Sequence, residues 1–189
     1  MDTARASLRV SHARRSIRLP GYDYSRPGAY FVTICTRDGE PLFGTVRARH
    51  VHLSAPGQAA RSCWLEIPEH FADVTLDAFI VMPDHLHGIV IISGMLDRHS
   101  VGAQHAAPLR SIGRLPAPTG SEGCSHGSLG AIVRSFKSAT TKRINEMRHT
   151  PEKRVWQRNY HDRIIRDDRE MQRARHYVLL NPLRWKDAG

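Results

Sequence analysis

Two histidines, His85 and His87, are the residues of this sequence whose types and spacing best suit chemistry. They follow Pro83 in the stretch AFIVMPDHLHGIVIIS, whose apolar and β-branched residues predict a buried strand on either side of the proline. Side chains two positions apart on a strand share one face, so the imidazoles form a clamp suited to a metal ion or to catalysis. The alternative is two core histidines satisfied by hydrogen bonds, because a buried imidazole needs a partner.

The same spacing occurs at His50 and His52, and it shows that spacing alone is not specific. There the neighbours are Arg47, Arg49 and Ser54, which indicates a solvated hairpin strand where histidines carry no desolvation penalty. Only the pair set in an apolar strand is therefore a candidate site.

A second candidate pair is Tyr177 with Asn181, on the last predicted helix. That helix begins at Asp167 or Asp168 and ends at Asn181, because the residue before a proline is steered out of the helical region. Tyr177 and Asn181 are one turn apart, so a phenol and a carboxamide lie together at the edge of the buried stripe. They either face a site, or the tyrosine merely anchors the helix at the rim of the core.

Basic and aromatic residues gather in the second half of the chain. The segment 156–166 reads WQRNYHDRIIR and predicts either a short strand with a loop facing nucleic acid, or aromatic residues packing the rim of the core. Before it, Ser128 caps a predicted helix that places Arg134, Lys137 and Arg148 opposite its apolar stripe. Such a basic face is usually just the solvated side of the helix.

These residues must be positioned by strands and helices that the hydrophobic patterns predict. The predicted strands are Ala29–Thr36, Phe43–Leu53, Val74–Met82 and His85–Ser93, and further helices are predicted over Ser54–His70 and from Ser128. The stripe of the helix after Ser128 comprises Leu129, Ile132, Val133, Phe136, Ala139, Ile144 and Met147. Gly94–Gly127 is rich in Gly, Ser, Pro and Ala and predicts a long loop or a disordered insert.

Charge and composition indicate the kind of partner. The 189 residues suit one domain, and their net charge of +10 favours a polyanion, with nucleic acid first. Residues 1–19 read as a basic arm able to lie along phosphates. Cys35, Cys63 and Cys124 form no disulfide or zinc pattern, which fits a reducing cytoplasm, and no apolar run approaches the ~18 residues of a membrane helix.

Four ordered motifs of the chain resemble those of the REP-associated tyrosine transposases. These are relatives of the single-strand transposases of small bacterial insertion sequences, within the HUH endonuclease superfamily. The motifs are RRSIRLPGYDYSRPGAYFVTICT, PDHLHGIVI, WQRNYHDRIIRDDRE and HYVLLNPLRW. The resemblance covers roughly Arg14 to Lys186 apart from the insert, and the order of the four motifs makes it more specific than any one alone.

The resemblance implies an α+β fold, with an antiparallel sheet of four to five strands packed by helices in a ferredoxin-like or RRM-like arrangement. It implies one domain over residues 20–189, after the basic arm and with a flexible insert at 94–127. His85 and His87 would bind a divalent ion, and Asn181 stands where relatives place a polar third ligand. Tyr177 would be the nucleophile, with Tyr160 as its rival.

The function implied is a metal-dependent endonuclease and transposase that nicks and rejoins single-stranded hairpin DNA through a 5′-phosphotyrosine link. Imidazole ligands alone favour zinc or manganese, and the family favours Mg²⁺ or Mn²⁺, so Mn²⁺ satisfies both. The enzyme would act in the bacterial cytoplasm, at the nucleoid, as a monomer or homodimer. The implied DNA-binding side chains are Arg14, Arg15, Arg18, Arg134, Lys137, Trp156, Arg158 and Arg163.

Two other enzyme classes are excluded because residues of their motifs are missing. A histidine-triad hydrolase needs a further histidine where Ile89 stands, and a zinc deaminase needs H-x-E and PCxxC motifs that this sequence lacks. The alternative that stays open is a hairpin-binding protein on the same fold that does not cut. Both the histidine clamp and Tyr177 are intact, which argues against it.

Overall fold

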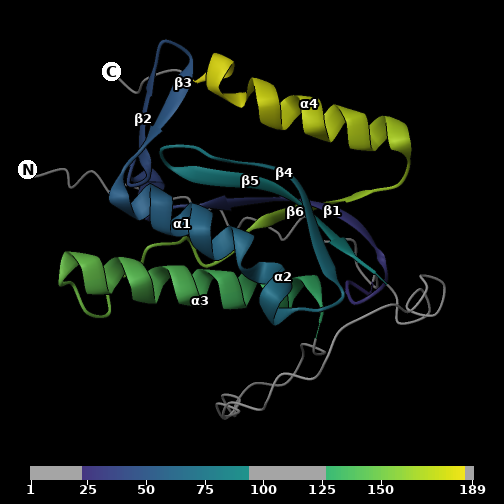
Figure 1. Ribbon diagram of the computed structural model, residues 1–189, viewed down its shortest axis with the longest axis horizontal. Helices are drawn as coiled ribbons and strands as arrows, with labels where there is room; N and C mark the ends of the chain where they lie inside the picture. Colours follow the sequence, from purple (N-terminus) through teal and green to yellow (C-terminus); the bar gives the residue numbers. More distant parts are fainter. Residues whose placement is uncertain (1–22, 94–126, 186–189) are drawn as a thin grey trace, which may run out of the picture.

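Strand β1 (Gly28–Cys35) is the centre of the fold, because it pairs with a strand on each side. The computed structural model describes residues 23–93 and 127–185, and in it four antiparallel strands form one sheet in the order β4-β5-β1-β6 (Figure 1). The other strands are β4 (Val74–Val81), β5 (His85–Ile92) and β6 (His161–Ile165). This confirms the predicted α+β class and the predicted strands β1, β4 and β5, and β6 shows that the segment after Trp156 does contribute a short strand. The basic arm and the insert up to residue 126 lie outside the described residues.

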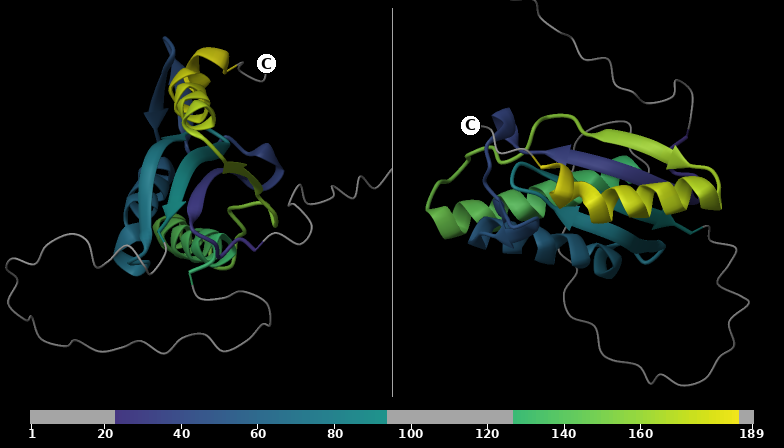
Figure 2. Two further views of the ribbon diagram at one scale, coloured as in Figure 1. Left: turned by 90° about the vertical axis from the view of Figure 1, so that its right-hand side faces the viewer. Right: turned by 90° about the horizontal axis from the view of Figure 1, so that it is seen from above.

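Helices cover both faces of this sheet (Figure 2). The helices α1 (Ala55–Leu65), α2 (Ile67–His70) and α3 (Leu129–Arg148) lie on one side, and α4 (Asp168–Arg184) lies on the other. Ser54 and Ser128 cap α1 and α3 as predicted, each accepting a hydrogen bond from a backbone amide three residues on. No helix within residues 23–93 and 127–185 is long and apolar enough to cross a membrane.

The two faces of the sheet differ because side chains alternate along each strand. On β1, Tyr30, Val32 and Ile34 are fully buried and join the core with the helices α1 and α3. On β5, Leu86 and Val90 point to this same core. His85 and His87 occupy the alternate positions and therefore point to the α4 side. One face thus carries the hydrophobic core, and the other is free to carry polar chemistry.

Gly88, between these positions on β5, makes room for the largest core side chain. Trp64 of α1 is fully buried, and its indole lies where a side chain at Gly88 would project. A Cβ built on Gly88 would overlap Cζ2 of that ring. The glycine therefore lets α1 pack closely against the histidine strand.

Helix α3 departs from its predicted stripe at two positions. Leu129, Ile132, Val133, Phe136 and Ile144 are buried as expected, but Ala139 and Met147 are exposed. Thr140 takes the buried position instead, and its hydroxyl donates to the Phe136 carbonyl four residues back. A threonine satisfied inside its own helix can be buried, which a hydrophobicity pattern does not detect.

The predicted strand Phe43–Leu53 is wrong, because this segment is a hairpin. It forms β2 (Gly44–Arg47) and β3 (His50–Leu53), which pair only with each other in a separate two-stranded sheet. The turn lies at Ala48 and Arg49, both of which have positive φ. Such turns normally use Gly, Asn or Asp, so the sequence carried no turn signal. His50 and His52 are exposed on β3, as expected of a solvated strand.

Asp167 caps helix α4, as predicted. The predicted end at Asn181 is wrong, because the helix continues through Pro182 to Arg184. A proline removes the hydrogen bond from its own nitrogen, and this close to the helix end only one such bond is lost. Arg175 anchors the helix to the sheet through a bidentate ion pair with Asp77, at 2.8 and 2.7 Å. Asp77 lies at the register shift in β4.

We expect Gly88→Ala to destabilise the protein by about 1–3 kcal/mol or more, because the added methyl group overlaps a fully buried indole. Urea unfolding followed by circular dichroism measures this. Trp64→Phe removes the overlapping ring, so the double variant should lose less stability than the sum of the two single variants. Strict additivity would contradict this account.

We expect Asp77→Asn to destabilise the protein above about pH 4 and to matter progressively less below it. The hydrogen bonds from Arg175 hold the pKa of the Asp77 carboxyl below its usual 3.8. A lowered folded-state pKa contributes stability that is present above the unfolded value and is lost as the pH falls through the folded one. Thermal unfolding across this range tests it, with Asp38→Asn, whose side chain is 86% exposed, as the matched control. A loss of stability in Asp77→Asn that does not change with pH would contradict the proposed contribution of the ion pair.

Candidate active site

The two imidazoles of β5 lie together on the α4 side of the sheet. The ring centroids of His85 and His87 are 4.5 Å apart, with the ring planes inclined at 68°. His85 Nδ1 donates to the Asp84 carboxylate at 2.5 Å, and His87 Nδ1 lies 2.8 Å from the Thr33 hydroxyl on β1. Thr33 stands directly opposite His87 in the antiparallel ladder, which brings their side chains to the same face.

These hydrogen bonds leave the other ring nitrogens available. Since the Asp84 carboxylate only accepts, His85 carries its hydrogen on Nδ1, and its neutral form has a lone pair on Nε2. The tautomer of His87 whose Nδ1 donates to Thr33 offers Nε2 in the same way. A histidine whose second ring nitrogen donates to a carboxylate, as His85 does to Asp84, is a usual arrangement around a protein-bound metal. The pair therefore fits a divalent ion.

Burial keeps His87 neutral. The residue is 5% exposed, and this burial, followed by the nearby His85, lowers the pKa of His87 to about 3. The Asp84 carboxylate opposes that shift but does not overcome it. At neutral pH the imidazole thus presents a lone pair rather than a charge.

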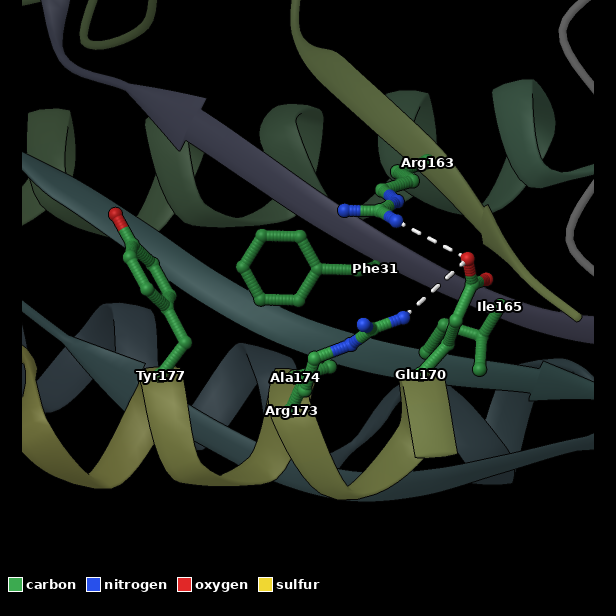
Figure 3. A pocket seen from close by; sticks show the side chains of 7 residues that line it. All are labelled: Phe31, Arg163, Ile165, Glu170, Arg173, Ala174 and Tyr177. Atoms are coloured by element: carbon green, nitrogen blue, oxygen red, sulfur yellow. Dashed lines mark hydrogen bonds and ion pairs between the residues drawn. The ribbon is translucent and has the colours of Figure 1, made fainter. Parts of the chain in front are cut away.

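Helix α4 brings Tyr177 to the histidines. Its ring centroid is 5.1 Å from that of His87 in an edge-on arrangement, and 5.8 Å from that of Phe31. The residue is 39% exposed, and the Arg184 guanidinium lies 5.6 Å from the centre of its ring. Figure 3 shows the phenol oxygen directed away from α4. Asn181, one turn further along the same helix, is buried.

The donors available for a metal are few. Among residues 23–93 and 127–185, no three His, Cys, Asp or Glu side chains gather in a metal-binding cluster. The third ligand predicted from the sequence, the side-chain amide of Asn181, is of another residue type, and its binding of a metal stays a prediction. A site built on His85 and His87 would leave coordination positions open for water or substrate.

Tyr160, the rival nucleophile, lies on the opposite side of the sheet. Its ring packs against the core, and the Lys137 ammonium of α3 lies 5.7 Å from the ring centre. The structure thus brings Tyr177 to the histidines and keeps Tyr160 with α3. His161, the next residue, pairs with Thr33 across β1 and β6 and is exposed.

Two of the predicted DNA-binding residues make contacts within the protein. Trp156 is 6% exposed and packs against Phe43 and Phe136, so its ring offers little surface for stacking on a base, and its contact with DNA stays a prediction. Lys137 donates to the backbone carbonyls of Gln157, Arg158 and Asn159 at 2.8, 3.4 and 3.0 Å. Burial lowers the pKa of Lys137 to about 8, and the nearby Cys35 partly opposes this shift.

The other predicted cations lie on two sides of the molecule. Arg134 lines a hollow along α3 with Lys142 and Arg154, and Arg158 lines a neighbouring hollow that also contains Arg154. Arg163 of β6 lies on the same face as Tyr177. Arg14, Arg15 and Arg18 lie outside the described residues. Their binding of DNA stays a prediction.

Three residues of the site were not singled out from the sequence: Thr33, Asp84 and Phe31. Thr33 and Phe31 sit in an ordinary apolar strand, and only the pairing register of β1 with β5 brings them beside His87. Asp84 did carry a signal, since it directly precedes His85. Its backbone carbonyl also accepts from the amide and hydroxyl of Thr36, which fixes the turn before the histidines.

Comparison with solved structures supports the fold. A structure described as a REP-associated tyrosine transposase bound to a REP hairpin aligns with a TM-score of 0.53 and 16% sequence identity, over 86% of this chain and 71% of that one. At this identity the likeness shows a shared fold.

Comparison by sequence shows the family. No family model matches the chain. An uncharacterized protein of Haemophilus influenzae (strain Rd) is 37% identical over 176 residues, which are 93% of this chain and 91% of that protein. The chain therefore belongs to the same family as this Haemophilus protein.

Proposed function

We propose that this protein is a metal-dependent single-stranded DNA endonuclease and transposase that nicks and rejoins hairpin DNA through Tyr177. The observation that carries the proposal is the position of the Tyr177 ring, edge-on to His87 at 5.1 Å on the α4 side of the sheet. An exposed phenol beside a pair of anchored imidazoles combines a nucleophile with a place for an electrophile. The likeness in fold to a REP-associated tyrosine transposase agrees with this reading.

In the proposed reaction the Tyr177 oxygen attacks the scissile phosphorus. A bond forms between this oxygen and phosphorus, the bond from phosphorus to the 3′ oxygen breaks, and the leaving oxygen takes up a proton as a 3′-OH. The phenolic proton passes to solvent. The phosphate bond energy is kept in the 5′-phosphotyrosine link, so attack by a 3′-OH reverses the step and joins strands without ATP.

The phenol needs assistance, because its ordinary pKa near 10 makes it a poor nucleophile at neutral pH. Mg²⁺ or Mn²⁺ held by His85, His87 and the Asn181 amide would polarise the phosphate as a Lewis acid. Asp84 and Thr33 orient the two imidazoles, and Arg184 over the Tyr177 ring adds positive charge beside the nucleophile.

Hairpin DNA is the substrate we propose from the charge of the chain and the fold. The net charge of +10 suits a polyanion, and the structural relative is described as bound to a REP hairpin. Arg134 and Arg158 on the α3 side and Arg163 beside Tyr177 are exposed cations able to contact phosphates. Cytoplasmic location at the nucleoid, and action as a monomer or homodimer, belong to the same proposal.

We expect the purified protein with Mn²⁺ to cleave labelled hairpin oligonucleotides with single-stranded flanks and to remain covalently attached. Tyr177→Phe should reduce the adduct to background, whereas Tyr160→Phe, the matched control, should retain it. Denaturing gels that resolve the protein–DNA adduct measure both. An adduct that persists in Tyr177→Phe identifies the wrong tyrosine, and hairpin binding without an adduct under any metal favours the non-cutting alternative.

We expect His85→Ala and His87→Ala to abolish tight Mn²⁺ binding in titration calorimetry. Asp84→Asn should weaken it about 10–100-fold, because it removes the partner that orients His85. His50→Ala and His52→Ala are the matched controls, with the same spacing on an exposed strand, and should change nothing. Equal Mn²⁺ binding by all variants would refute the metal site whatever the activity.

A further inference from the structure

A hollow of about 300 Å³ lies directly beside Tyr177, between α4 and the edge of the sheet. Its apolar lining comes from three elements: Phe31 of β1, Ile165 of β6 and Ala174 of α4. Figure 3 shows the Phe31 ring in the middle of this space, with Tyr177 to one side of it. The Phe31 ring stacks on His87 with their centroids 5.4 Å apart, and it also lines the hollow next to the proposed nucleophile, where His87 does not reach.

The far side of the hollow is cationic. Arg163 and Arg173 both point to Glu170, with nitrogen–oxygen distances of 3.1 and 3.8 Å (Figure 3). The Glu170 side chain is 12% exposed, whereas those of Arg163 and Arg173 are 67% and 58% exposed. The other carboxylate oxygen of Glu170 accepts a hydrogen bond from the backbone amide of Arg166. Glu170 therefore holds two solvent-facing guanidinium groups at the rim, and their charge exceeds its own.

The hollow continues along β6. A second one, of about 490 Å³, shares Phe31 and Arg163 with the first and extends to Tyr24, His161 and Arg166. Phe31 and Arg163 face each other across β1 and β6, which explains why both hollows include them. Together they form a concave track that leads from Tyr177 along the sheet edge.

We infer that the hollow beside Tyr177 binds one unpaired nucleotide of the single strand next to the attacked phosphate. The base stacks on Phe31, and its phosphate contacts Arg163 and Arg173. An aromatic platform with cations at its rim is the combination that single-stranded nucleic acid requires, because every base has a face to stack and every linkage a charge. A paired base in a duplex keeps its faces covered by its neighbours, so this subsite selects unpaired DNA.

This inference rests on the proposed function for its substrate, but its test needs neither metal nor cleavage. Fluorescence anisotropy in chelator compares two labelled strands of about ten nucleotides, oligothymidine and an abasic strand with the same phosphates. Phe31→Leu should weaken oligothymidine binding about fivefold or more and leave abasic-strand binding within a factor of about two. Phe31→Tyr should keep the preference for bases. Phe79→Leu, a phenylalanine packed on the core side, is the matched control.

The phosphate contacts have a separate readout. Arg163→Gln and Arg173→Gln should weaken binding of both strands and reduce the salt dependence of log K by about 0.7 for each phosphate that the variant no longer neutralises. Arg61→Gln, an exposed arginine of α1, should leave that slope unchanged. Phe31→Leu with an undiminished preference for bases, or unchanged salt slopes at Arg163 and Arg173, would overturn the inference. If Phe31→Leu loses the preference for bases but the protein never forms a covalent adduct, the nucleotide subsite stands and the proposed nuclease function is contradicted.

Discussion

The alternation of side chains along β1 and β5 is the constraint on which the rest of the structure depends. Because every second residue faces α1 and α3, the core takes Val32, Ile34 and Leu86, and the intervening Thr33 and His87 are delivered to the opposite face. A shift of one residue in the pairing would exchange the two sets. The pairing register that buries the core residues therefore also determines which side chains form the candidate site.

Hydrogen bonds behind the imidazoles turn this register into a defined site. The Asp84 carboxylate and the Thr33 hydroxyl each engage one Nδ1, so each ring is oriented before any ligand arrives.

Helix α4, in contrast, buries little. Its buried residues are Val178 and Asn181, while Leu179 and Leu183 are exposed. The ion pair of Arg175 with Asp77 and the ring contacts of Tyr177 with Phe31 and His87 add to its packing on the sheet. The side chain that we propose as nucleophile is thus carried by a helix that contributes little to the hydrophobic core.

The positive charge of the chain serves two purposes that only the structure separates. The Lys137 ammonium is used inside the protein, where it ties together three carbonyls of the segment that leads to β6. Trp156 in that segment fills the core between Phe43 and Phe136. A motif that mixes aromatic and basic residues can therefore be structural in part. Arg163, held at the rim of the hollow beside Tyr177, is the member of this segment that faces solvent next to the site.

The sequence by itself determined the strands β1, β4 and β5, the capped helices and the same-face pairing of His85 with His87, because these follow from local periodicity and capping. It left open whether the segment after Trp156 forms the short strand β6. It did not determine the hairpin turn at Ala48 and Arg49, which lacks the usual turn residues. Only the tertiary structure decided that Thr33 holds His87, that Tyr177 rather than Tyr160 reaches the histidines, and that Phe31 borders them. These contacts join residues far apart in the chain, and they depend on strand register and on how α4 packs, which no local pattern encodes.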